Sequence, residues 1–161
     1  MPITDPMDAL RFLQVALDAR EVALQSCELH PEIGVLLDHP NGVTRFTYAS
    51  VAGGNVQAVA LFAEADRMHG LPCFNVGIAV IEPLRGRGLA STVLEKAIAE
   101  MKNGFRRTPM KAFYLEAVVS ISNEPSNRLA SKAFSSTRES GTDAYAGEPI
   151  FQYVRKVECD A

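Results

Sequence analysis

Residues 74–101 constrain the fold of this 161-residue chain more than any other stretch of its sequence. An uncharged run at 74–81 is followed by a turn with two glycines at 85–90, and then by a segment of helical periodicity. An uncharged run of this length is typical of a strand that is covered on both faces. A strand, a glycine-rich turn and a helix N-terminus in succession form an anion site, because backbone N–H groups converge there and the helix dipole favours negative charge. The stretch therefore predicts an α/β chain that binds the phosphate or pyrophosphate of a cofactor.

The helix after the turn is indicated by a single apolar stripe. The stripe recurs with the period of an α-helix and consists of Ala90, Val93, Leu94, Ala97, Ile98 and Met101. Gly104 follows it, and we expect this glycine to end the helix in a left-handed conformation. Gly86 and Gly88 in the turn lack a Cβ atom, so they can adopt a positive φ and let the backbone approach a ligand closely.

Three phosphate-binding motifs could account for such a turn, and their spacing separates them. A Walker A loop requires a lysine directly before a serine or threonine, and no lysine precedes Ser91 or Thr92. A dinucleotide fingerprint requires a third glycine, where this chain has Ser91. It also requires an acidic residue about 20 positions further on, whereas Glu116 lies farther away in a predicted strand. The dinucleotide motif is therefore a weak match and a distant alternative. The third motif, [RQ]-x-x-G-x-[GA], is satisfied by Arg85, Gly88 and Ala90.

With this third motif the chain resembles the GCN5-related N-acetyltransferase (GNAT) superfamily, whose members bind the pyrophosphate of acetyl-CoA at this turn. The resemblance implies that backbone amides of residues 85–91 hold the pyrophosphate, with added charge from Arg85 and Arg87 and an extra donor in the Ser91 hydroxyl. It also implies that backbone groups of the preceding strand bind the pantetheine arm and orient the acetyl carbonyl. The cofactor-binding residues expected here are Ile78, Ala79, Val80, Arg85, Gly86, Arg87, Gly88, Leu89, Ala90 and Ser91. The alternative is a glycine-rich turn that only connects a strand to a helix.

A second match to the superfamily lies downstream. Residues 111–119 are rich in β-branched and aromatic side chains and predict a strand. Asn123 and Pro125 then predict the first turn of a helix. The superfamily has a helix of the type N-x-x-[AS]-x-x-L-Y-x-K-x-G-F in this place, which is matched by Asn123, Ser126, Leu129 and Lys132. The resemblance implies that Asn123 contacts the pantetheine arm and that Ser126 lies in the helix beside the cofactor. Capping of the helix is the structural alternative for Asn123.

The groups for acid–base chemistry are less clearly marked. Ala130 stands where the superfamily has a tyrosine that often acts as the general acid, and the terminal Gly-Phe is reduced to Ala133-Phe134. An alkylammonium group has a pKa of about 10.4, so a base or a desolvating pocket must expose its lone pair at pH 7. Members often carry a Glu or His on the central strand for this purpose, but residues 74–81 contain neither. Glu116 on the neighbouring strand is our candidate base, and Tyr145 in a late loop is our candidate acid.

Other groups stay open at this point. Glu64 and His69 are further options for the base, and Tyr153 is a further option for the acid, although its alternating strand position is more typical of a residue in the core or on the sheet surface. Cys73 is disfavoured as a covalent nucleophile, because direct transfer in a ternary complex needs none. A thiolate leaving group can also depart without a dedicated acid.

The N-terminal part is expected to be helical. Asp5-Pro6 predicts a helix that starts there and runs to about Glu28, where His30-Pro31 ends it. The superfamily usually has a strand ahead of its first helix. In this chain that strand is short and formed by residues 1–4, is lost, or is supplied by residues 33–37.

The remaining segments fit a central mixed sheet flanked by helices. Residues 43–51 and 56–64 are joined by a Gly-Gly turn and predict a hairpin. Residues 135–148 predict a loop with at most one short strand, and residues 150–157 predict a last strand. We therefore expect an α/β (α+β) fold of the acyl-CoA N-acyltransferase type, with a mixed twisted sheet, in one domain over residues 1–161.

Composition narrows the function classes. A net charge of −3 and a pI near 5.6 argue against a nucleic-acid-binding surface, which is normally basic. No apolar run approaches the ~20 residues of a membrane span, and no signal-peptide pattern opens the chain. Cys27, Cys73 and Cys159 are odd in number and lack metal-ligand spacing, which indicates reduced thiols in a cytoplasmic protein.

Together with the resemblance, these features predict an N-acetyltransferase that moves an acetyl group from acetyl-CoA to a primary amine by direct transfer. The acceptor is expected to be a small molecule or a peptide, and exposed strand edges leave room for a homodimer. The alternative from another class is a non-catalytic acyl-CoA-binding sensor of the same fold. The missing tyrosine and the missing central-strand carboxylate favour that alternative.

Overall fold

The computed structural model describes residues 5–135, 137–143 and 147–159. The strands are β1 (Gln25–Ser26), β2 (Ile33–Asp38), β3 (Arg45–Ala52), β4 (Asn55–Met68), β5 (Leu71–Val80), β6 (Ala112–Ser120), β7 (Glu139–Thr142) and β8 (Pro149–Glu158). The helices are α1 (Pro6–Asp18), α2 (Leu89–Phe105) and α3 (Glu124–Ala133), with short 3₁₀ turns at Pro40–Gly42 and Glu82–Leu84.

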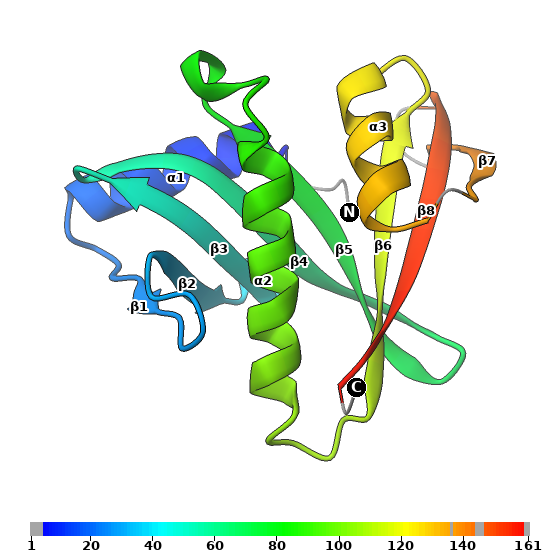
Figure 1. Cartoon of the computed structure of the whole chain (residues 1–161), viewed down its shortest axis with the longest axis horizontal. Coiled ribbons are helices and arrows are strands. Elements are labelled where there is room, and N and C mark those ends of the chain that lie inside the picture. Colours follow the sequence, from blue (N-terminus) through cyan, green and yellow to red (C-terminus); the bar gives the residue numbers. More distant parts are fainter. Residues whose placement is uncertain (1–4, 136, 144–146, 160–161) are drawn as a thin grey trace.

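The strands form one sheet in the order β1-β2-β3-β4-β5-β6-β8-β7 (Figure 1). Each neighbouring pair is antiparallel except β5 and β6, which are parallel. The predicted mixed sheet flanked by helices is confirmed.

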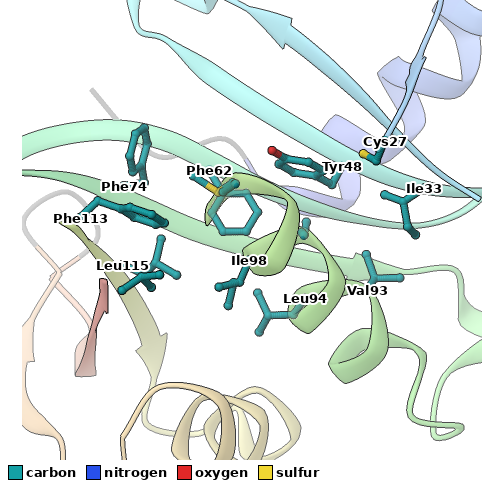
Figure 2. Close-up of a cluster of buried hydrophobic side chains, with 14 of the residues drawn as sticks. Cys27, Ile33, Tyr48, Phe62, Phe74, Val93, Leu94, Ile98, Phe113 and Leu115 are labelled. Atoms are coloured by element: carbon teal, nitrogen blue, oxygen red, sulfur yellow. The ribbon is translucent and has the colours of Figure 1, made fainter. Parts of the chain in front are cut away.

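Helices cover the two faces of the sheet differently: α2 and α3 lie on one face and α1 lies on the other (Figure 1). Beneath α2, Leu94 packs with Phe62 of β4 and Phe113 of β6 in the main apolar core (Figure 2). On the opposite face, Leu10 of α1 packs with Val59 of β4 in a second cluster. Because successive strand residues point to opposite faces, these two clusters fix which face each side chain of β4, β5 and β6 occupies.

The predicted helix after the glycine turn is α2, and its start is confirmed while its end is not. Gly88 is the N-cap with a φ of 78°, and Gly86 has a φ of 76°. The left-handed cap expected at Gly104 is wrong, because the helix continues through that residue to Phe105 and ends on Arg106 in a right-handed conformation. Phe105 stacks on Phe74 with 5.9 Å between ring centroids, so aromatic packing favours the additional turn.

The N-terminal helix is shorter than the sequence predicts. It starts at the predicted Asp5 cap, whose side chain accepts a hydrogen bond from the backbone N–H of Met7, but it ends at Asp18 rather than near Glu28. The chain then turns back, and Leu24 packs so closely over Gly34 of β2 that a Cβ atom there would lie 2.7 Å from it. This contact with the sheet competes with further helix. Of the three options for the first strand, formation by residues 33–37 is confirmed as β2, and residues 1–4 lie outside the described residues.

The other predicted strands are present. The Gly-Gly turn joins β3 and β4 as a hairpin, and the last strand is β8. In the described part of the late loop, residues 139–142 form the short strand β7, which is the edge of the sheet beyond β8.

Candidate functional site

The parallel strands β5 and β6 separate along their length. They are paired at three positions, Cys73↔Tyr114, Phe74↔Leu115 and Asn75↔Glu116. Beyond Asn75, residues 76–80 of β5 remain paired with β4, and residues 117–120 of β6 remain paired with β8. The two strands therefore diverge towards the end of the sheet at which α2 and α3 begin (Figure 1). We call residues 76–80 and 117–120 the splayed segments.

Backbone groups of β5 face β6 at alternate positions of its splayed segment. The N–H of Ile81 donates to the carbonyl oxygen of Gln57 at 3.0 Å, so these residues form a hydrogen-bonded pair at the end of the antiparallel β4–β5 ladder. Such pairs alternate with pairs that are not hydrogen-bonded. Ala79 therefore directs its N–H and C=O to β4, whereas those of Ile78 and Val80 point towards β6. Of the three strand residues predicted to bind the cofactor, Ile78 offers its N–H and C=O to the space between the strands. Val80 offers its N–H there, because its carbonyl oxygen accepts a hydrogen bond from Arg85.

The same alternation applies to β6. The N–H of Cys159 donates to the carbonyl oxygen of Lys111 at 2.8 Å, which sets the hydrogen-bonded positions of the β6–β8 ladder. Val118 accordingly directs its backbone groups away from β8 and towards β5. Sequence reasoning did not identify Val118, because its role depends on the pairing of β6 with β8, which no local signal reports.

The glycine turn leads from β5 into α2 and has the local geometry of an anion site. Gly88 has no side chain to cap the helix, and no side-chain cap is present there. The N–H groups of the first helical turn, at Leu89, Ala90 and Ser91, have no acceptor within the helix. Because these groups point out of the helix end together with its positive dipole, the turn can accept a phosphate.

The two arginines of the turn differ in their contacts. Nε of Arg85 donates to the carbonyl oxygen of Val80 at 2.9 Å, and its Nη2 lies 3.9 Å from the Sδ of Met7. Arg85 therefore ties the turn to the end of β5 and to α1. Arg87 is exposed. The geometry favours Arg87 over Arg85 as the source of side-chain charge for a phosphate.

A polar network holds α3 against β6 and β8. The predicted cap is confirmed, since Oδ1 of Asn123 accepts a hydrogen bond from the backbone N–H of Ser126 at 3.2 Å. Nδ2 of the buried Asn127 donates to the carbonyl oxygens of Ser120 at 3.0 Å and Asn123 at 2.9 Å. The hydroxyl of Tyr153 donates to Oδ1 of Asn127 at 2.7 Å. Sequence reasoning missed Asn127, although a polar residue on the inner side of a helix is a signal for such a network.

Of the two tyrosines considered as the acid, the one among the described residues, Tyr153, is engaged within the fold. Tyr153 is completely buried and bonded to Asn127, so its interpretation as a core residue is confirmed. Tyr145 lies outside the described residues. Ala130, in the place of the superfamily tyrosine, is buried against Tyr153 and has no proton to give.

Glu116, the predicted base, lies on the sheet face opposite to α2 and α3. Leu115 packs in the core beneath α2, so its neighbour Glu116 points to the other face. Asn75 points to that face for the same reason, because Phe74 packs beneath α2. Nε2 of Gln152 in β8 donates to Oε2 of Glu116 at 2.6 Å. The structure therefore places the predicted base beside the last paired residue of β5.

Cys73 shares the face of Glu116 and is buried, with 1% of its surface exposed. Burial, and to a smaller extent the Glu116 carboxylate, raise the pKa of the Cys73 thiol to about 11. The thiol is therefore protonated at neutral pH, which agrees with the expectation that it is not a covalent nucleophile.

The other candidate bases lie elsewhere. Glu64 lines a pocket of about 310 Å³ with Phe74 and Phe105, on the face of α2. His69 is in the β4–β5 turn, with its ring 5.6 Å from that of Tyr114. A second pocket, of about 470 Å³, lies on the side of α3 that faces β8 and includes Arg138. Neither pocket is lined by a residue of the splayed segments or of the glycine turn.

Residues 5–135, 137–143 and 147–159 contain neither a candidate membrane helix nor a candidate metal site. No helix in this part of the chain is long and apolar enough to cross a membrane. No group of three or more His, Cys, Asp or Glu side chains there is placed to hold a metal ion. Cys27, Cys73 and Cys159 are all buried.

Solved structures of acetyltransferases share this fold. RimL, a ribosomal L7/L12 alpha-N-protein acetyltransferase in complex with coenzyme A, matches with 21% sequence identity and a TM-score of 0.52 over 72% of this chain. A GNAT-family acetyltransferase from Streptococcus pneumoniae matches with 14% identity and a TM-score of 0.53, over 97% of each chain. A ribosomal-protein-S5-alanine acetyltransferase from Vibrio fischeri matches with 14% identity and a TM-score of 0.55, over 71% of this chain.

These matches establish the fold. The chain spans slightly less than two thirds of two of these proteins, 64% of RimL and 62% of the Vibrio fischeri protein. No protein-family model matches the sequence, and no curated protein matches it. The chain has the acyl-CoA N-acyltransferase fold of the GNAT acetyltransferases, as the two sequence motifs predicted.

Proposed function

We propose that this chain, which has the GNAT fold, is an N-acetyltransferase that transfers an acetyl group from acetyl-CoA to a primary amine. The observation that carries the proposal is the separation of β5 and β6 beyond Asn75, next to a helix N-terminus without a side-chain cap. Separated strands offer unused backbone donors and acceptors, which an extended amide-containing arm such as pantetheine can bind in the manner of an added strand.

Residues present in the chain fit such a ligand. The N–H groups of Leu89, Ala90 and Ser91 would hold the pyrophosphate, and exposed Arg87 would add charge. Backbone groups of Ile78 and Val118 would bind the pantetheine arm from its two sides. Acetyl-CoA would supply an acetyl group activated as a thioester.

Glu116 is the group best placed to accept the proton of the amine. Its carboxylate lies on the open face beside Asn75, and the hydrogen bond from Gln152 at 2.6 Å fixes one of its oxygens. In direct transfer, the ammonium group first gives one proton to Glu116, and the neutral nitrogen then forms a bond to the acetyl carbon while the carbon–sulfur bond breaks. The nitrogen loses a second proton to solvent as the amide forms. The thiolate takes its proton from solvent, since Ala130 cannot supply one.

The acceptor and setting are also proposals. RimL is a ribosomal L7/L12 alpha-N-protein acetyltransferase, so a peptide N-terminus is one acceptor class to test and a small primary amine is another. We propose a cytoplasmic location, because the chain has an odd number of cysteines without metal-ligand spacing. Strands β1 and β7 provide the sheet edges for a homodimer.

The first experiment is a thermal-shift titration with acetyl-CoA, CoA, NAD and ATP in parallel. A ligand at 100 times its dissociation constant adds ~2.7 kcal/mol, which corresponds to roughly 5–10 °C for a domain of this size. A rise with the CoA species alone, followed by amine-dependent thiol release from acetyl-CoA, is the expected result. No shift with millimolar CoA would mean that the turn at residues 85–90 only connects β5 to α2.

A non-catalytic acyl-CoA sensor is the second candidate. It is favoured by Ala130 in the place of the superfamily tyrosine and by the absence of an acidic or histidine side chain at residues 74–81. Tight binding of acetyl-CoA without thiol release against any amine would support it. Displacement of CoA by NAD would contradict both candidates and favour a dinucleotide site.

A further inference from the structure

Asn75 carries a buried polar atom that nothing in the fold satisfies. Its Oδ1 is the one buried side-chain oxygen or nitrogen, among the described residues, for which no hydrogen-bond partner is present. Such an atom costs stability, because its hydrogen bonds to water are lost on folding and are not replaced. An orphaned acceptor of this kind calls for an explanation, and a ligand that donates a hydrogen bond is one.

The position of Asn75 connects this atom to the proposed chemistry. Asn75 is the last residue of β5 that pairs with β6, and its partner in the register is Glu116. Directly paired residues of neighbouring strands lie about 5 Å apart with side chains on the same face. We call Asn75, Glu116 and Gln152 the amine corner. It lies where the splayed segments begin, on the face opposite to α2 and α3.

The surroundings restrict how a ligand can reach this corner. The next β5 residue on the same face is Gly77, where a Cβ atom would lie 2.7 Å from Cγ of Pro6 in α1. Helix α1 therefore covers the β5 side closely. On the β6 side, the next residue on this face is Val118, which is 41% exposed. A ligand would thus approach over β6 and place its end group between Asn75 and Glu116.

We propose that Oδ1 of Asn75 and the carboxylate of Glu116 together bind the nitrogen of the acceptor and select primary amines. The inference rests on the proposed acetyl transfer and specifies its substrate class. A primary ammonium group has three N–H donors, and after one proton passes to Glu116 two donors and a lone pair remain. One donor bonds to Asn75 and the other to Glu116, which leaves the lone pair for the acetyl carbon. A hydroxyl group has a single donor and cannot satisfy both acceptors. A secondary amine also has a single N–H donor once its ammonium form has given up a proton, so it cannot satisfy both acceptors either.

The test compares Asn75→Leu, which has a similar size and lacks the acceptor, with Asn75→Asp, which retains an oxygen at this position. The substrates are matched pairs of a primary amine and its N-methyl derivative, with acetyl-CoA saturating. We expect Asn75→Leu to lower kcat/KM for primary amines by about 10- to 100-fold. The ratio of kcat/KM for a primary amine to kcat/KM for its N-methyl derivative should fall close to one. The thermal shift with CoA should stay unchanged, and the unliganded protein should be no less stable.

Asn75→Asp should retain the preference for primary amines. Its added negative charge lies beside the Glu116 carboxylate, and two neighbouring carboxylates repel each other, so the acidic limb of the kcat/KM profile should move to higher pH. A residue with a merely structural role would not move that limb. Asn55→Leu, at the exposed start of β4, is the matched control and should behave as the wild type.

The outcomes separate the two proposals. An unchanged kcat/KM and an unchanged amine preference in Asn75→Leu would overturn the role of Asn75 and leave acetyl transfer intact. Absence of a CoA thermal shift in the wild type would overturn the proposed function. If the wild type binds CoA without turnover, the CoA-saturated protein is titrated with the same amines by calorimetry. Binding of primary amines that is lost in Asn75→Leu would then support the amine corner in a non-catalytic protein, and no binding would overturn it.

Discussion

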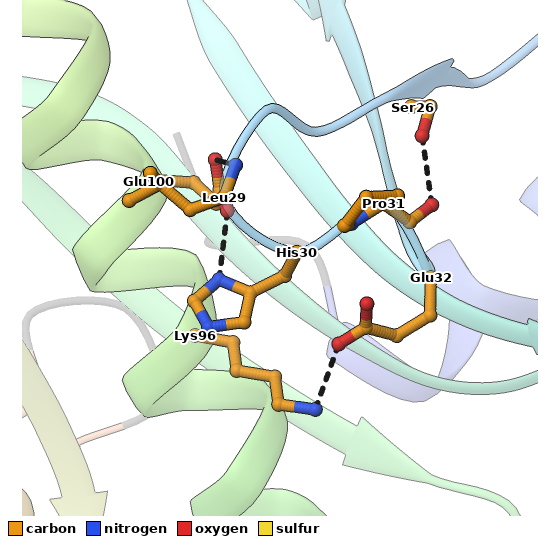
Figure 3. Close-up of polar contacts among 7 residues, drawn as sticks. All are labelled: Ser26, Leu29, His30, Pro31, Glu32, Lys96 and Glu100. Carbon is orange, nitrogen blue, oxygen red and sulfur yellow. Dashed lines mark hydrogen bonds and ion pairs between the residues drawn. The ribbon is translucent and has the colours of Figure 1, made fainter.

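Two polar clusters of this molecule each contain a glutamate that is hydrogen-bonded to its neighbours. One cluster uses both oxygens of its glutamate within the fold, whereas the other keeps a buried acceptor without a partner in the described part of the chain. The first, which we call the clasp, consists of Leu29, His30, Glu32, Lys96 and Glu100 and joins the chain before β2 to α2 (Figure 3). The second is the amine corner on the other face of the sheet. In the clasp, the buried Glu100 accepts from the N–H of Leu29 at 3.1 Å and lies 2.7 Å from Nδ1 of His30. In the amine corner, Glu116 accepts a hydrogen bond from Gln152, while Oδ1 of Asn75 has no hydrogen-bond partner among the described residues.

The difference indicates which cluster serves stability and which serves binding. Each carboxylate oxygen of Glu100 is used within the fold, so a ligand would gain little there. Asn75 keeps an unused acceptor at the point where two strands separate, which costs stability and is useful only when something binds. Changes in the clasp should therefore alter stability without altering chemistry, and changes in the amine corner should do the reverse.

The largest effect is expected from Glu116→Gln. The amide keeps the size of the side chain and removes the base, so kcat at neutral pH should fall by about 100- to 1,000-fold. The free energy of unfolding, measured by urea denaturation, should change little, because Glu116 is held by a single side-chain hydrogen bond. Glu64→Gln is the matched control, since Glu64 lies on the other face, and it should retain full activity. An active Glu116→Gln enzyme would assign the base elsewhere.

His30→Ala is the reciprocal change in the clasp. It leaves the buried carboxylate of Glu100 with the N–H of Leu29 alone, and breaking a buried pair in this way costs 3–5 kcal/mol when both groups are fully buried. Because the His30 side chain is 29% exposed, we expect about 3 kcal/mol by urea denaturation. The kcat/KM of the folded enzyme should not change. Lys96→Ala, which breaks the exposed pair with Glu32, should have a much smaller effect. Loss of activity at full stability in His30→Ala would contradict the division between the clusters.

The sequence predicts the glycine turn and the starts of α2 and α3 better than it predicts the surroundings of Asn75. The glycine turn, the N-terminus of α2 and the Asn123 cap follow from local rules of glycine conformation and helix capping, and all three are present. The orphaned oxygen of Asn75 depends on three strands that meet across the chain, and no local signal marks it. The hydrogen bond from Nε of Arg85 to the carbonyl oxygen of Val80 is likewise unmarked in the sequence, since a long side chain takes whichever partner the tertiary structure brings near.

Alkaline pH provides a probe in each cluster, because each has a buried thiol nearby. Burial, and then Glu100 and Glu32, raise the pKa of Cys27 from its ordinary value of 9.0 to about 11. Burial, and then Glu116, raise the pKa of Cys73 similarly. The folded state therefore holds protons that the unfolded state releases above pH 9, so stability should be constant below pH 9 and fall as the pH rises towards 11.

Each thiol should account for about 1 kcal/mol of the loss at pH 10. Urea denaturation at pH 7 and pH 10 measures this loss as a difference in the free energy of unfolding. Cys27→Ala and Cys73→Ala should each remove the part of the loss that comes from the replaced thiol. Glu116→Gln should reduce only the share of Cys73, because its charge faces that thiol and not Cys27. A pH slope that Glu116→Gln leaves unchanged would mean that burial alone protects Cys73.

The smallest effect is expected at Asn123, a polar residue that caps a helix and is also predicted to bind the cofactor. Its Oδ1 caps α3 through the N–H of Ser126, so Asn123→Ala should lower the free energy of unfolding by about 1 kcal/mol. Asn123→Asp retains a capping oxygen and should retain this stability, but it lacks the amide N–H donors that a pantetheine carbonyl would use. If Asn123 also contacts the cofactor, both variants should weaken acetyl-CoA binding by thermal shift, whereas only Asn123→Ala should destabilise the unliganded protein. If Asn123→Asp binds acetyl-CoA like the wild type, Asn123 belongs with the clasp as a structural group, and the cofactor is held from the β5 side and the α2 turn.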